Sequence, residues 1–350
     1  MKVLGIFRGF PGLGRVVSGV SICEELKNRH GHEIKLISYL QGEKYLTQLG
    51  YSSLYSASTM DYCSIGLLPT GKMGAYIHAI IRSYQPDIII IDGEPLMVQS
   101  IKISHPNIKV VVLLNPADVD NPNNDKEAMD FFNYAYSRAD LAIVHGLRKI
   151  APCSQYNRMF SLNTIIRPEI LQIQNIPNKK IYCVLGGGTV NVGPHFMSST
   201  MKIADLCIKA ANDFSEYEFM IICSSRNISD ALNEWHLPIN VKIINDIVDA
   251  VEFYTDASLI ITRSGRNTLS ELVALGIPTI SFITGDIYRI KEQEQNLESI
   301  DAKNIIPLTT DIILSDFKDK ISRSLRHTCE RKTFMAGNNK AIDHILELIN

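Results

Sequence analysis

Short apolar runs alternate with longer amphipathic stretches along the whole chain. The apolar runs have the length of strands and are almost continuously hydrophobic, as parallel strands covered on both faces are. The stretches between them repeat apolar residues at helical spacing. This alternation is typical of βαβ units and predicts an α/β fold built on parallel sheets.

The pattern places the predicted elements as follows. In the first half, we expect strands over Lys2–Phe7, Glu33–Ser38, Asp87–Ile91, Lys109–Leu113 and Asp140–Val144. In the second half, we expect strands over Ile181–Leu185, Tyr217–Cys223, Val241–Ile244, Ser258–Thr262, Thr279–Phe282 and Asn304–Ile306. Between and after them we expect helices, including Val16–Asn28, Ala75–Tyr84, Asp125–Ser137, Lys202–Asp213, Thr268–Leu275, Ile290–Ile300 and Lys340–Leu348.

A break in this rhythm divides the chain. Two prolines and several polar residues interrupt the pattern from Arg167 to Lys179, and we interpret this segment as an interdomain linker. The chain has 350 residues, more than one ordinary domain. We therefore predict an N-terminal domain over residues 1–166, a C-terminal domain over residues 180–335 and a final helical segment over residues 336–350.

Composition and charge narrow the class of protein. With 45% hydrophobic and 21% charged residues, the chain has an ordinary globular composition. Its formal net charge of −2 argues against a general nucleic-acid binder. The sequence holds no apolar run of about 18 residues, so it predicts no transmembrane segment. Arg8 and Gly9 interrupt the first apolar run too early for a signal peptide.

The cysteines indicate a reducing compartment. There are seven of them, scattered along the chain without a C-x-x-C pair, and several lie inside apolar runs. We expect reduced thiols in a cytoplasmic protein. No Cys/His set has zinc-binding spacing, so we expect no protein-bound metal.

The strongest chemical signal follows the apolar run Ser258–Thr262. Arg263, Ser264 and Gly265 form a turn that opens a helix, and Glu271 lies on that helix. Backbone N–H groups and the positive end of a helix dipole suit a phosphate. A carboxylate further along the helix can accept hydrogen bonds from the hydroxyls of a ribose. The segment therefore indicates a nucleotide site.

A second glycine-rich loop, from Arg8 to Arg15, joins the first strand to the first helix. Gly12 and Gly14 permit a close backbone approach, so the loop is either a wall of a ligand site or a plain βα turn. The dinucleotide fingerprint is not met, because Val17 stands where its third glycine belongs and the second strand ends without an acidic residue. The sequence therefore argues against a nicotinamide or flavin enzyme.

The order Arg-Ser-Gly-x-x-Thr-x-x-Glu over Arg263–Glu271, followed by Gly276-Ile277-Pro278 and Glu292-Gln293-x-x-Asn296, resembles a known nucleotide-sugar site. It is similar to that of glycosyltransferases with two Rossmann-like domains, the GT-B type, and in particular to family 28, which includes the peptidoglycan N-acetylglucosaminyl transferase. The resemblance implies two Rossmann-like domains facing each other across a cleft, with the last helix crossing back to the N-terminal domain. It is specific over Gly186–Asn296 and topological over the first half.

The resemblance implies a donor site in the C-terminal half. Backbone N–H groups, a hydroxyl and a guanidinium would meet the diphosphate, a carboxylate would hold the ribose, a backbone edge would read uracil, and two amides would bind the sugar. In that order the residues are Gly187, Gly188, Thr189, Ser264, Gly265 and Arg263; Glu271; Ile247; and Gln293 with Asn296. UDP is favoured by analogy, and TDP and GDP stay open.

The catalytic side departs from the family. Related enzymes have a His after the glycine loop that acts as general base, and Arg15 stands at that position here. A guanidinium cannot accept a proton at physiological pH. Either the base is Asp92 or Glu94, after the predicted strand Asp87–Ile91, or the acceptor is an anion held by Arg8 or Arg15 that needs no base.

Other polar residues have simpler interpretations. Asp118 and Asp120 have the spacing of a metal clamp, but they lie in a segment with strong turn chemistry, and we interpret them as a turn. His145 follows a predicted strand and is a second choice for the base.

The sequence therefore predicts a metal-independent, inverting transfer of a hexosyl or N-acetylhexosaminyl group. The donor would be a nucleotide diphosphate-sugar acting as co-substrate without a further cofactor, and the acceptor a small molecule or a lipid-linked one. A nucleotide-sugar hydrolase or epimerase, and a non-catalytic donor-binding partner, are the alternatives. Leu67, Leu68 and Lys72 form a short segment suited to peripheral membrane contact. The sugar, the acceptor and the oligomeric state do not follow from the sequence.

Overall fold

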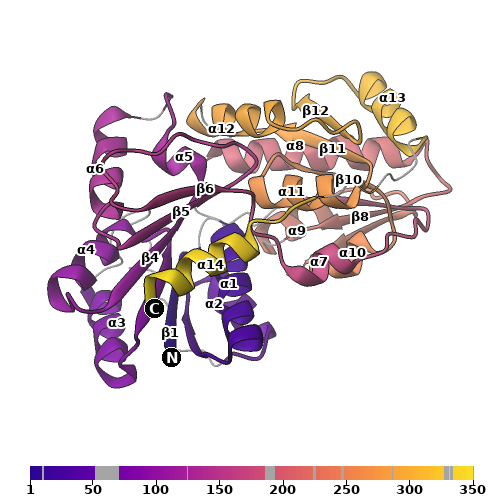
Figure 1. The fold of residues 1–350 in the computed structure, drawn as a ribbon. Coiled ribbons are helices and arrows are strands. Elements are labelled where there is room, and N and C mark those ends of the chain that lie inside the picture. The colour runs from indigo at the N-terminus through magenta and orange to yellow at the C-terminus, as the bar shows by residue number, and fades with distance from the viewer. Residues whose placement is uncertain are drawn as a thin grey trace. The chain divides into compact units, whose positions relative to one another are not determined.

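The computed structural model describes the chain except for residues 10–11, 52–70, 124, 186–193, 224–225, 246–247, 286, 327–330, 332–333 and 350. The chain forms two compact units (Figure 1). Unit 1 comprises Met1–Arg167 and Ala336–Asn350, and unit 2 comprises Pro168–Met335. Each unit contains a six-stranded sheet of parallel strands among the described residues, which confirms the predicted α/β class with two Rossmann-like domains.

The four inner strands of the unit 1 sheet are almost entirely buried, whereas its two edge strands are partly exposed. In spatial order the strands are β2 (Glu33–Ile37), β1 (Lys2–Phe7), β3 (Ile88–Asp92), β4 (Lys109–Leu114), β5 (Leu141–His145) and β6 (Met159–Leu162). The helices of the unit are α1 (Gly14–His30), α2 (Gln41–Gln48), α3 (Gly71–Tyr84), α4 (Pro95–Ser104), α5 (Pro116–Val119), α6 (Lys126–Tyr136) and α14 (Asn338–Ile349).

The strand order determines which face each helix covers. Right-handed crossovers put connections that run in opposite directions along a sheet on opposite faces. The helix α1 leads from β1 to β2, whereas α3 and α4 lead in the other direction, so α1 lies on one face and α3 and α4 lie on the other. The last helix, α14, contacts α1, β4 and β5, and thereby covers the rest of the α1 face (Figure 1).

A buried asparagine anchors α14 in unit 1. The side-chain amide of Asn338 donates to Ser21 Oγ at 3.1 Å, to the Ile166 carbonyl at 2.9 Å and to Glu25 Oε1. Its Oδ1 accepts from the Ile166 N–H at 2.9 Å. These bonds satisfy a buried polar side chain and tie the end of the chain to α1 and to the segment that leaves the sheet.

Unit 2 repeats the same architecture. In spatial order its strands are β12 (Ile305–Thr309), β11 (Thr279–Ile283), β10 (Ala257–Arg263), β7 (Lys180–Val184), β8 (Glu218–Ile222) and β9 (Val241–Ile244). Its helices are α7 (Pro168–Gln172), α8 (Pro194–Ala211), α9 (Arg226–Asn233), α10 (Ala250–Tyr254), α11 (Arg266–Leu275), α12 (Ile287–Glu298) and α13 (Leu314–Leu325).

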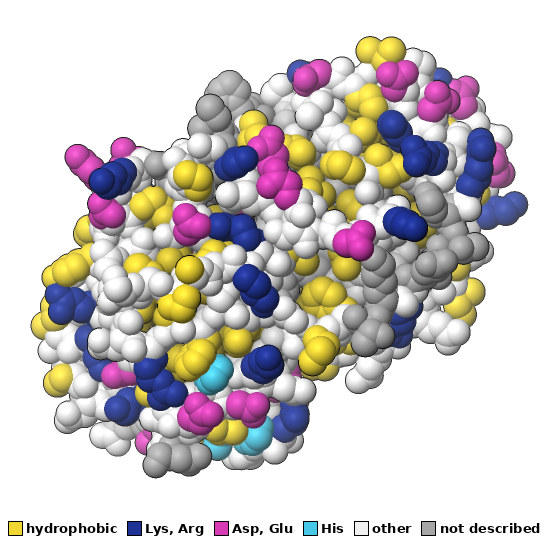
Figure 2. Space-filling model, turned by 45° about the horizontal axis from the view of Figure 1, so that its top comes forward, with side chains coloured by type: hydrophobic (Ala, Val, Ile, Leu, Met, Phe, Trp, Pro, Cys, Tyr) yellow, Lys and Arg dark blue, Asp and Glu magenta, His cyan; other side chains and the backbone are white. Residues whose placement is uncertain are grey.

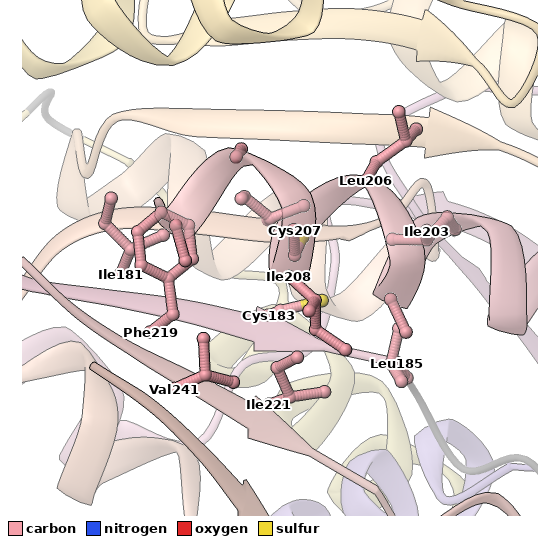
Figure 3. Packing of buried hydrophobic residues seen from close by; sticks show 14 of the residues in the cluster. Ile181, Cys183, Leu185, Ile203, Leu206, Cys207, Ile208, Phe219, Ile221 and Val241 are labelled. Atoms are coloured by element: carbon pink, nitrogen blue, oxygen red, sulfur yellow. The ribbon is translucent and has the colours of Figure 1, made fainter. Parts of the chain in front are cut away.

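The core of unit 2 forms between α8 and the sheet. Figure 3 shows Ile203 and Cys207 of α8 among side chains of β7 and β8 such as Cys183 and Phe219. The helix α13 contacts α8, β10 and β11. It adds Phe317 to the same buried cluster, so α13 lies beside α8 on the same face of the sheet.

Two local expectations differ from the structure. The segment over residues 167–179, expected to be an irregular linker, contains α7 and belongs to unit 2 from Pro168 onward. Its Ile170 and Ile173 are buried, which explains why it packs instead of crossing solvent. The strand β6 was not anticipated, because an edge strand of four residues is too short to show a hydrophobic period.

The surface shows mixed charges (Figure 2), and the described cysteines are free thiols. Basic and acidic side chains are interspersed on the face shown in Figure 2. In the described part of the chain the cysteines are free thiols, and most of them are buried. No described helix is long and apolar enough to span a bilayer. Among the described residues, no cluster of three or more His, Cys, Asp or Glu side chains is arranged to hold a metal.

Candidate functional site

Both sheets have a topological switch point, where ligands bind at the carboxyl ends of parallel strands. In unit 1 the switch lies between β1 and β3, and in unit 2 it lies between β7 and β10. The register pairs Phe7 with Asp92, so the loops that follow β1 and β3 begin side by side. The two sequence motifs that predicted a catalytic loop and a nucleotide site therefore lie at the switch points of their own units.

Arg15 lies between two carboxylates in unit 1. Its guanidinium pairs with Asp92 Oδ1 at 2.5 Å and with Asp118 Oδ1 at 2.8 Å. Although burial opposes the charge on both groups, the ion pairs raise the pKa of Arg15 and lower the pKa of Asp118. Both terminal nitrogens of Arg15 are thus engaged by carboxylates, and the pairs link α1 to the end of β3 and to α5.

A glycine between the two acidic residues makes room for the arginines. Gly93 has φ of +94°, a conformation that favours glycine. A Cβ at this position would lie 2.7 Å from the Arg8 Cβ and 2.8 Å from the Arg15 Cδ. The Arg8 guanidinium donates to the Gly93 carbonyl, and the Arg8 N–H donates to the Asp92 carbonyl at 2.9 Å.

Glu94 is buried beside this cluster. Its Oε1 accepts a 2.5 Å hydrogen bond from the Tyr39 hydroxyl and lies 3.7 Å from Arg8 Nε. Its Oε2 is also buried and has no hydrogen-bond partner among the described residues. Burial raises the pKa of Glu94 to about 7, while Arg8, the Tyr39 hydrogen bond and Arg15 limit the rise. Glu94 can therefore exchange a proton near neutral pH.

This pKa predicts a pH-dependent cost to stability. Below about pH 4.5, Glu94 is protonated in both the folded and the unfolded chain. As the pH rises from there to about 7, the carboxyl ionises only in the unfolded chain, so the free energy of unfolding falls. Above pH 7 this loss reaches its full size, because Glu94 is then ionised in both states. The free energy of unfolding in urea should therefore rise for Glu94→Gln relative to the wild type between pH 5 and pH 8, by about 3 kcal/mol at most. An advantage that is equal at both pH values would contradict this ionisation range.

The structure also describes the surroundings of three other predicted residues of unit 1, whose functional roles stay predictions. Neither Gly12 nor Gly14 is among the described glycines with positive φ, and a Cβ on Gly12 would meet nothing within 4 Å. Close approaches within the chain occur at Gly9, whose Cβ would lie 1.9 Å from the Tyr39 carbonyl, and at Gly93. His145 is buried, and its Nδ1 accepts from the Ile165 N–H at 3.2 Å, which gives it a structural contact.

In unit 2 the predicted phosphate site surrounds the start of α11. Gly265 is the residue before the helix, it supplies no side-chain cap, and a Cβ there would meet nothing within 4 Å. The Arg263 guanidinium donates to Ser199 Oγ at 3.2 Å and to Thr200 Oγ1 on α8. Ser264 is fully buried, and its hydroxyl bonds with Ser281 Oγ at 2.7 Å. Because the Ser264 hydroxyl already has a partner, the backbone N–H groups at the start of α11 and the Arg263 guanidinium are better candidates for phosphate contacts.

The predicted ribose and sugar residues follow on α11 and α12. Glu271 is buried, and its Oε2 accepts from the Tyr254 hydroxyl at 3.0 Å, which orients the carboxylate. Gln293 holds the backbone of Thr284, accepting from its N–H at 3.1 Å and donating to its carbonyl at 2.5 Å. Asn296 is buried, and its Nδ2 has no partner among the described residues. Their roles in donor binding remain predictions.

Several predicted residues lie outside the described residues. They are Gly187, Gly188 and Thr189 of the second glycine loop, Ile247, and Leu67 and Leu68 of the segment suited to membrane contact.

Comparison with known proteins connects these sites to a family. The model of the glycosyltransferase family 28 C-terminal domain matches residues 189–345. An uncharacterized glycosyltransferase of Methanosarcina acetivorans is 21% identical over 81% of this chain and 79% of its own length. The UDP-N-acetylglucosamine–N-acetylmuramyl-(pentapeptide) pyrophosphoryl-undecaprenol N-acetylglucosamine transferase of Listeria monocytogenes is 29% identical over 25% of this chain and 24% of its own length.

Solved structures show the same fold. The structure of Arabidopsis thaliana UGT89C1 with UDP-L-rhamnose matches with a TM-score of 0.63 and 13% identity, covering 100% of this chain and 99% of that one. The chain has the GT-B fold and resembles the family 28 glycosyltransferases. The GT-B fold is not restricted to transferases: a UDP-GlcNAc 2-epimerase of Methanocaldococcus jannaschii, in complex with UDP-GlcNAc and UDP, matches with a TM-score of 0.63 and 15% identity over 99% of each chain. The family model and the curated relatives support sugar transfer in general.

Sequence reasoning missed three members of these GT-B sites. Neither Tyr39 nor Tyr254 was singled out, and Asp118 was interpreted as part of a turn. Asp118 does cap the short helix α5, since its carboxylate accepts from the Asn115 N–H at 2.9 Å, and it also pairs with Arg15. The local sequence therefore predicted the backbone role of Asp118, but it did not predict the ion pair with Arg15.

Proposed function

We propose that the chain transfers a sugar from a UDP-sugar to a neutral hydroxyl group of its acceptor, with inversion at the anomeric carbon. The main support is Glu94, a buried carboxyl with a pKa of about 7 whose Oε2 has no hydrogen-bond partner among the described residues. A base with a pKa near the working pH is suited to take a proton from a hydroxyl. Glu94 is therefore our candidate for the general base, in place of the His of related enzymes.

The charges of unit 1 favour a neutral acceptor over an anionic one. Arg15 is bound by Asp92 and Asp118, and Arg8 donates to Gly93 and lies near Glu94. An anionic acceptor would have to displace one of these carboxylates and leave it buried without its cation, which is costly. A hydroxyl group imposes no such exchange.

The proposed step balances as a single displacement. The acceptor oxygen forms a bond to C1 of the sugar as its proton moves to Glu94 Oε2. The bond between C1 and the diphosphate oxygen breaks, and UDP leaves with the electron pair. We propose that the N–H groups at the start of α11 and the Arg263 guanidinium stabilise the negative charge that develops on UDP. The proposal uses no protein-bound metal.

The substrate class rests on the relatives. Two structural neighbours were solved with UDP-sugars, and the Listeria relative is named for transfer of N-acetylglucosamine to a pyrophosphoryl-undecaprenol acceptor. We therefore propose a hexosyl or N-acetylhexosaminyl donor and a small or lipid-linked acceptor with a free hydroxyl.

Binding of UDP provides the first test. We expect calorimetry to show selective binding of UDP over TDP, GDP and ADP, and Glu271→Gln to weaken it about tenfold or more, because the ribose loses charge-assisted hydrogen bonds. The matched control is Glu252→Gln, since Glu252 is an exposed carboxyl of α10 in the same unit. Equal binding by Glu271→Gln and the wild type would remove Glu271 from the donor site.

The same purified protein separates the alternatives. It would be incubated with UDP-N-acetylglucosamine, with and without a panel of hydroxyl acceptors, while UDP release and the sugar are followed by NMR. Sugar found on an acceptor supports the proposal. UDP release into water alone indicates a hydrolase, and a changed configuration at C2 indicates an epimerase, a reading that has support only from the fold of the archaeal neighbour.

A further inference from the structure

The two oxygens of the Glu94 carboxyl have different surroundings. Oε1 accepts the 2.5 Å hydrogen bond from Tyr39 and lies near Arg8, whereas Oε2 has no partner among the described residues. The side chain of Glu94 is 1% exposed, so bulk water does not make up the difference. Because a buried oxygen without a partner is costly, Oε2 indicates a place where a donor group binds.

The backbone around Tyr39 is held in place from two sides. The Tyr39 carbonyl accepts from the Gly42 N–H at 3.1 Å, and Gly9 approaches it so closely that a Cβ would lie 1.9 Å away. The next residue, Leu40, has φ of 58° and ψ of −122°, which a side-chain-bearing residue rarely adopts. Strained backbone of this kind persists where the surroundings enforce it, so the backbone that carries Tyr39 is held in place.

Tyr39 is a permanent donor in this arrangement. Burial and the neighbouring Glu94 raise the pKa of Tyr39, so its hydroxyl keeps its proton over the working pH range. A phenol that always donates to Oε1 keeps the carboxyl plane in one orientation and favours the ionised form of Glu94.

We propose that Tyr39 is a positioning residue, whose hydrogen bond to Oε1 of Glu94 fixes the carboxyl so that Oε2 receives the proton of the acceptor hydroxyl. This inference rests on the proposed function, because it assumes that Glu94 is the base. It assigns one oxygen to orientation and the other to chemistry.

The charged and titratable groups around Glu94 come from several elements. Those that act on Glu94 itself are Arg8 after β1, Arg15 on α1 and Tyr39 after β2. Arg15 in turn faces Asp92 at the end of β3, Asp118 on α5 and Tyr136 on α6. Among these described groups, Tyr39 lies within hydrogen-bond distance of the Glu94 carboxyl and donates to it. Substituting Tyr39 by phenylalanine removes that bond and leaves every formal charge in place.

The test compares Tyr39→Phe with the wild type by two measurements. The first is a carbon NMR titration of the carboxyl in protein labelled at the glutamate side chains, with the Glu94 signal assigned by its loss in Glu94→Gln. We expect the Glu94 midpoint to move up by about one pH unit in Tyr39→Phe. The second is the pH profile of sugar transfer from UDP-N-acetylglucosamine to a hydroxyl acceptor, followed by UDP release with and without the acceptor. We expect its acidic limb to move up by the same amount, and the rate at high pH to stay about tenfold low with an unchanged KM for the donor.

The control is Tyr84→Phe, which removes the hydrogen bond from another buried tyrosine to the Glu33 carbonyl in unit 1. It should leave the midpoint and the profile unchanged. An unmoved Glu94 midpoint in Tyr39→Phe overturns the inference, and so does a moved midpoint with full activity at high pH. A fully active Glu94→Gln variant overturns the proposed base itself, which separates the two failures. A thermal unfolding scan of each variant shows that the comparison is made on folded protein.

Discussion

Replacing Glu94 by glutamine should lower the rate of sugar transfer by about a hundredfold to ten-thousandfold, the usual contribution of a general base. The amide is nearly the same size as the carboxyl and can still accept from Tyr39, but it cannot take a proton. The proposed donor residues lie in unit 2, so UDP binding should stay the same. The expected change is therefore in kcat, with little change in the KM for the donor.

The measurement is initial rate against pH, with UDP release and labelled acceptor followed in parallel. The matched control is Glu25→Gln, a buried carboxyl of α1 in the same unit that bonds with Asn338 and Arg29. Glu25→Gln should transfer sugar at the wild-type rate. If Glu94→Gln keeps more than about a tenth of the wild-type rate, another group is the base, and Asp92 is then the next candidate.

Replacing Arg15 by methionine should destabilise unit 1 by about 3–5 kcal/mol, the cost of leaving buried charge without its partner. Asp92 is fully buried beside Arg15, whereas Asp118 is partly exposed, so most of the cost falls on Asp92. Adding Asp92→Asn to Arg15→Met should recover part of the loss, because the second change removes the buried charge that has lost its arginine.

Urea unfolding followed by far-UV circular dichroism measures this loss. The only tryptophan of the chain, Trp235, lies in unit 2 and reports on that unit separately. Arg158→Met is the control, because Arg158 pairs with Glu347 at the surface and should cost less than about 1 kcal/mol. A fully stable Arg15→Met variant that has lost transfer would instead support the alternative in which Arg15 holds an anionic acceptor.

Together these two experiments test how the chain functions without the His of related enzymes. We infer that Arg15 is the cation that links the end of β3 to α5, and that Glu94 takes over the proton transfer. The two roles predict different losses: Glu94→Gln loses rate in a stable protein, and Arg15→Met loses stability.

Much of the fold could be predicted because its signals are local. The strands β1 and β9 lie at the predicted residues, and the predicted bounds of the other anticipated strands differ from the observed ones by a few residues at most. A nearly continuous apolar run indicates a strand of a sheet that is covered on both faces, and this can be recognised without knowing the rest of the fold. The failures were also local: β6 is too short to show a period, and α7 lies in a segment whose prolines hid its buried isoleucines.

The sequence by itself determined the α/β class, the parallel strands, the two-unit organisation and the motif from Arg263 to Glu271, because each of these is written in neighbouring residues. Only the tertiary structure decided which charged groups meet. Arg15 and Asp118 are 103 positions apart, and Tyr39 and Glu94 are 55 apart. They come together because β1, β2, β3 and β4 end at one edge of one sheet, an order that no local pattern encodes. Burial then sets the pKa of Glu94, since the cost of its charge depends on everything packed around it.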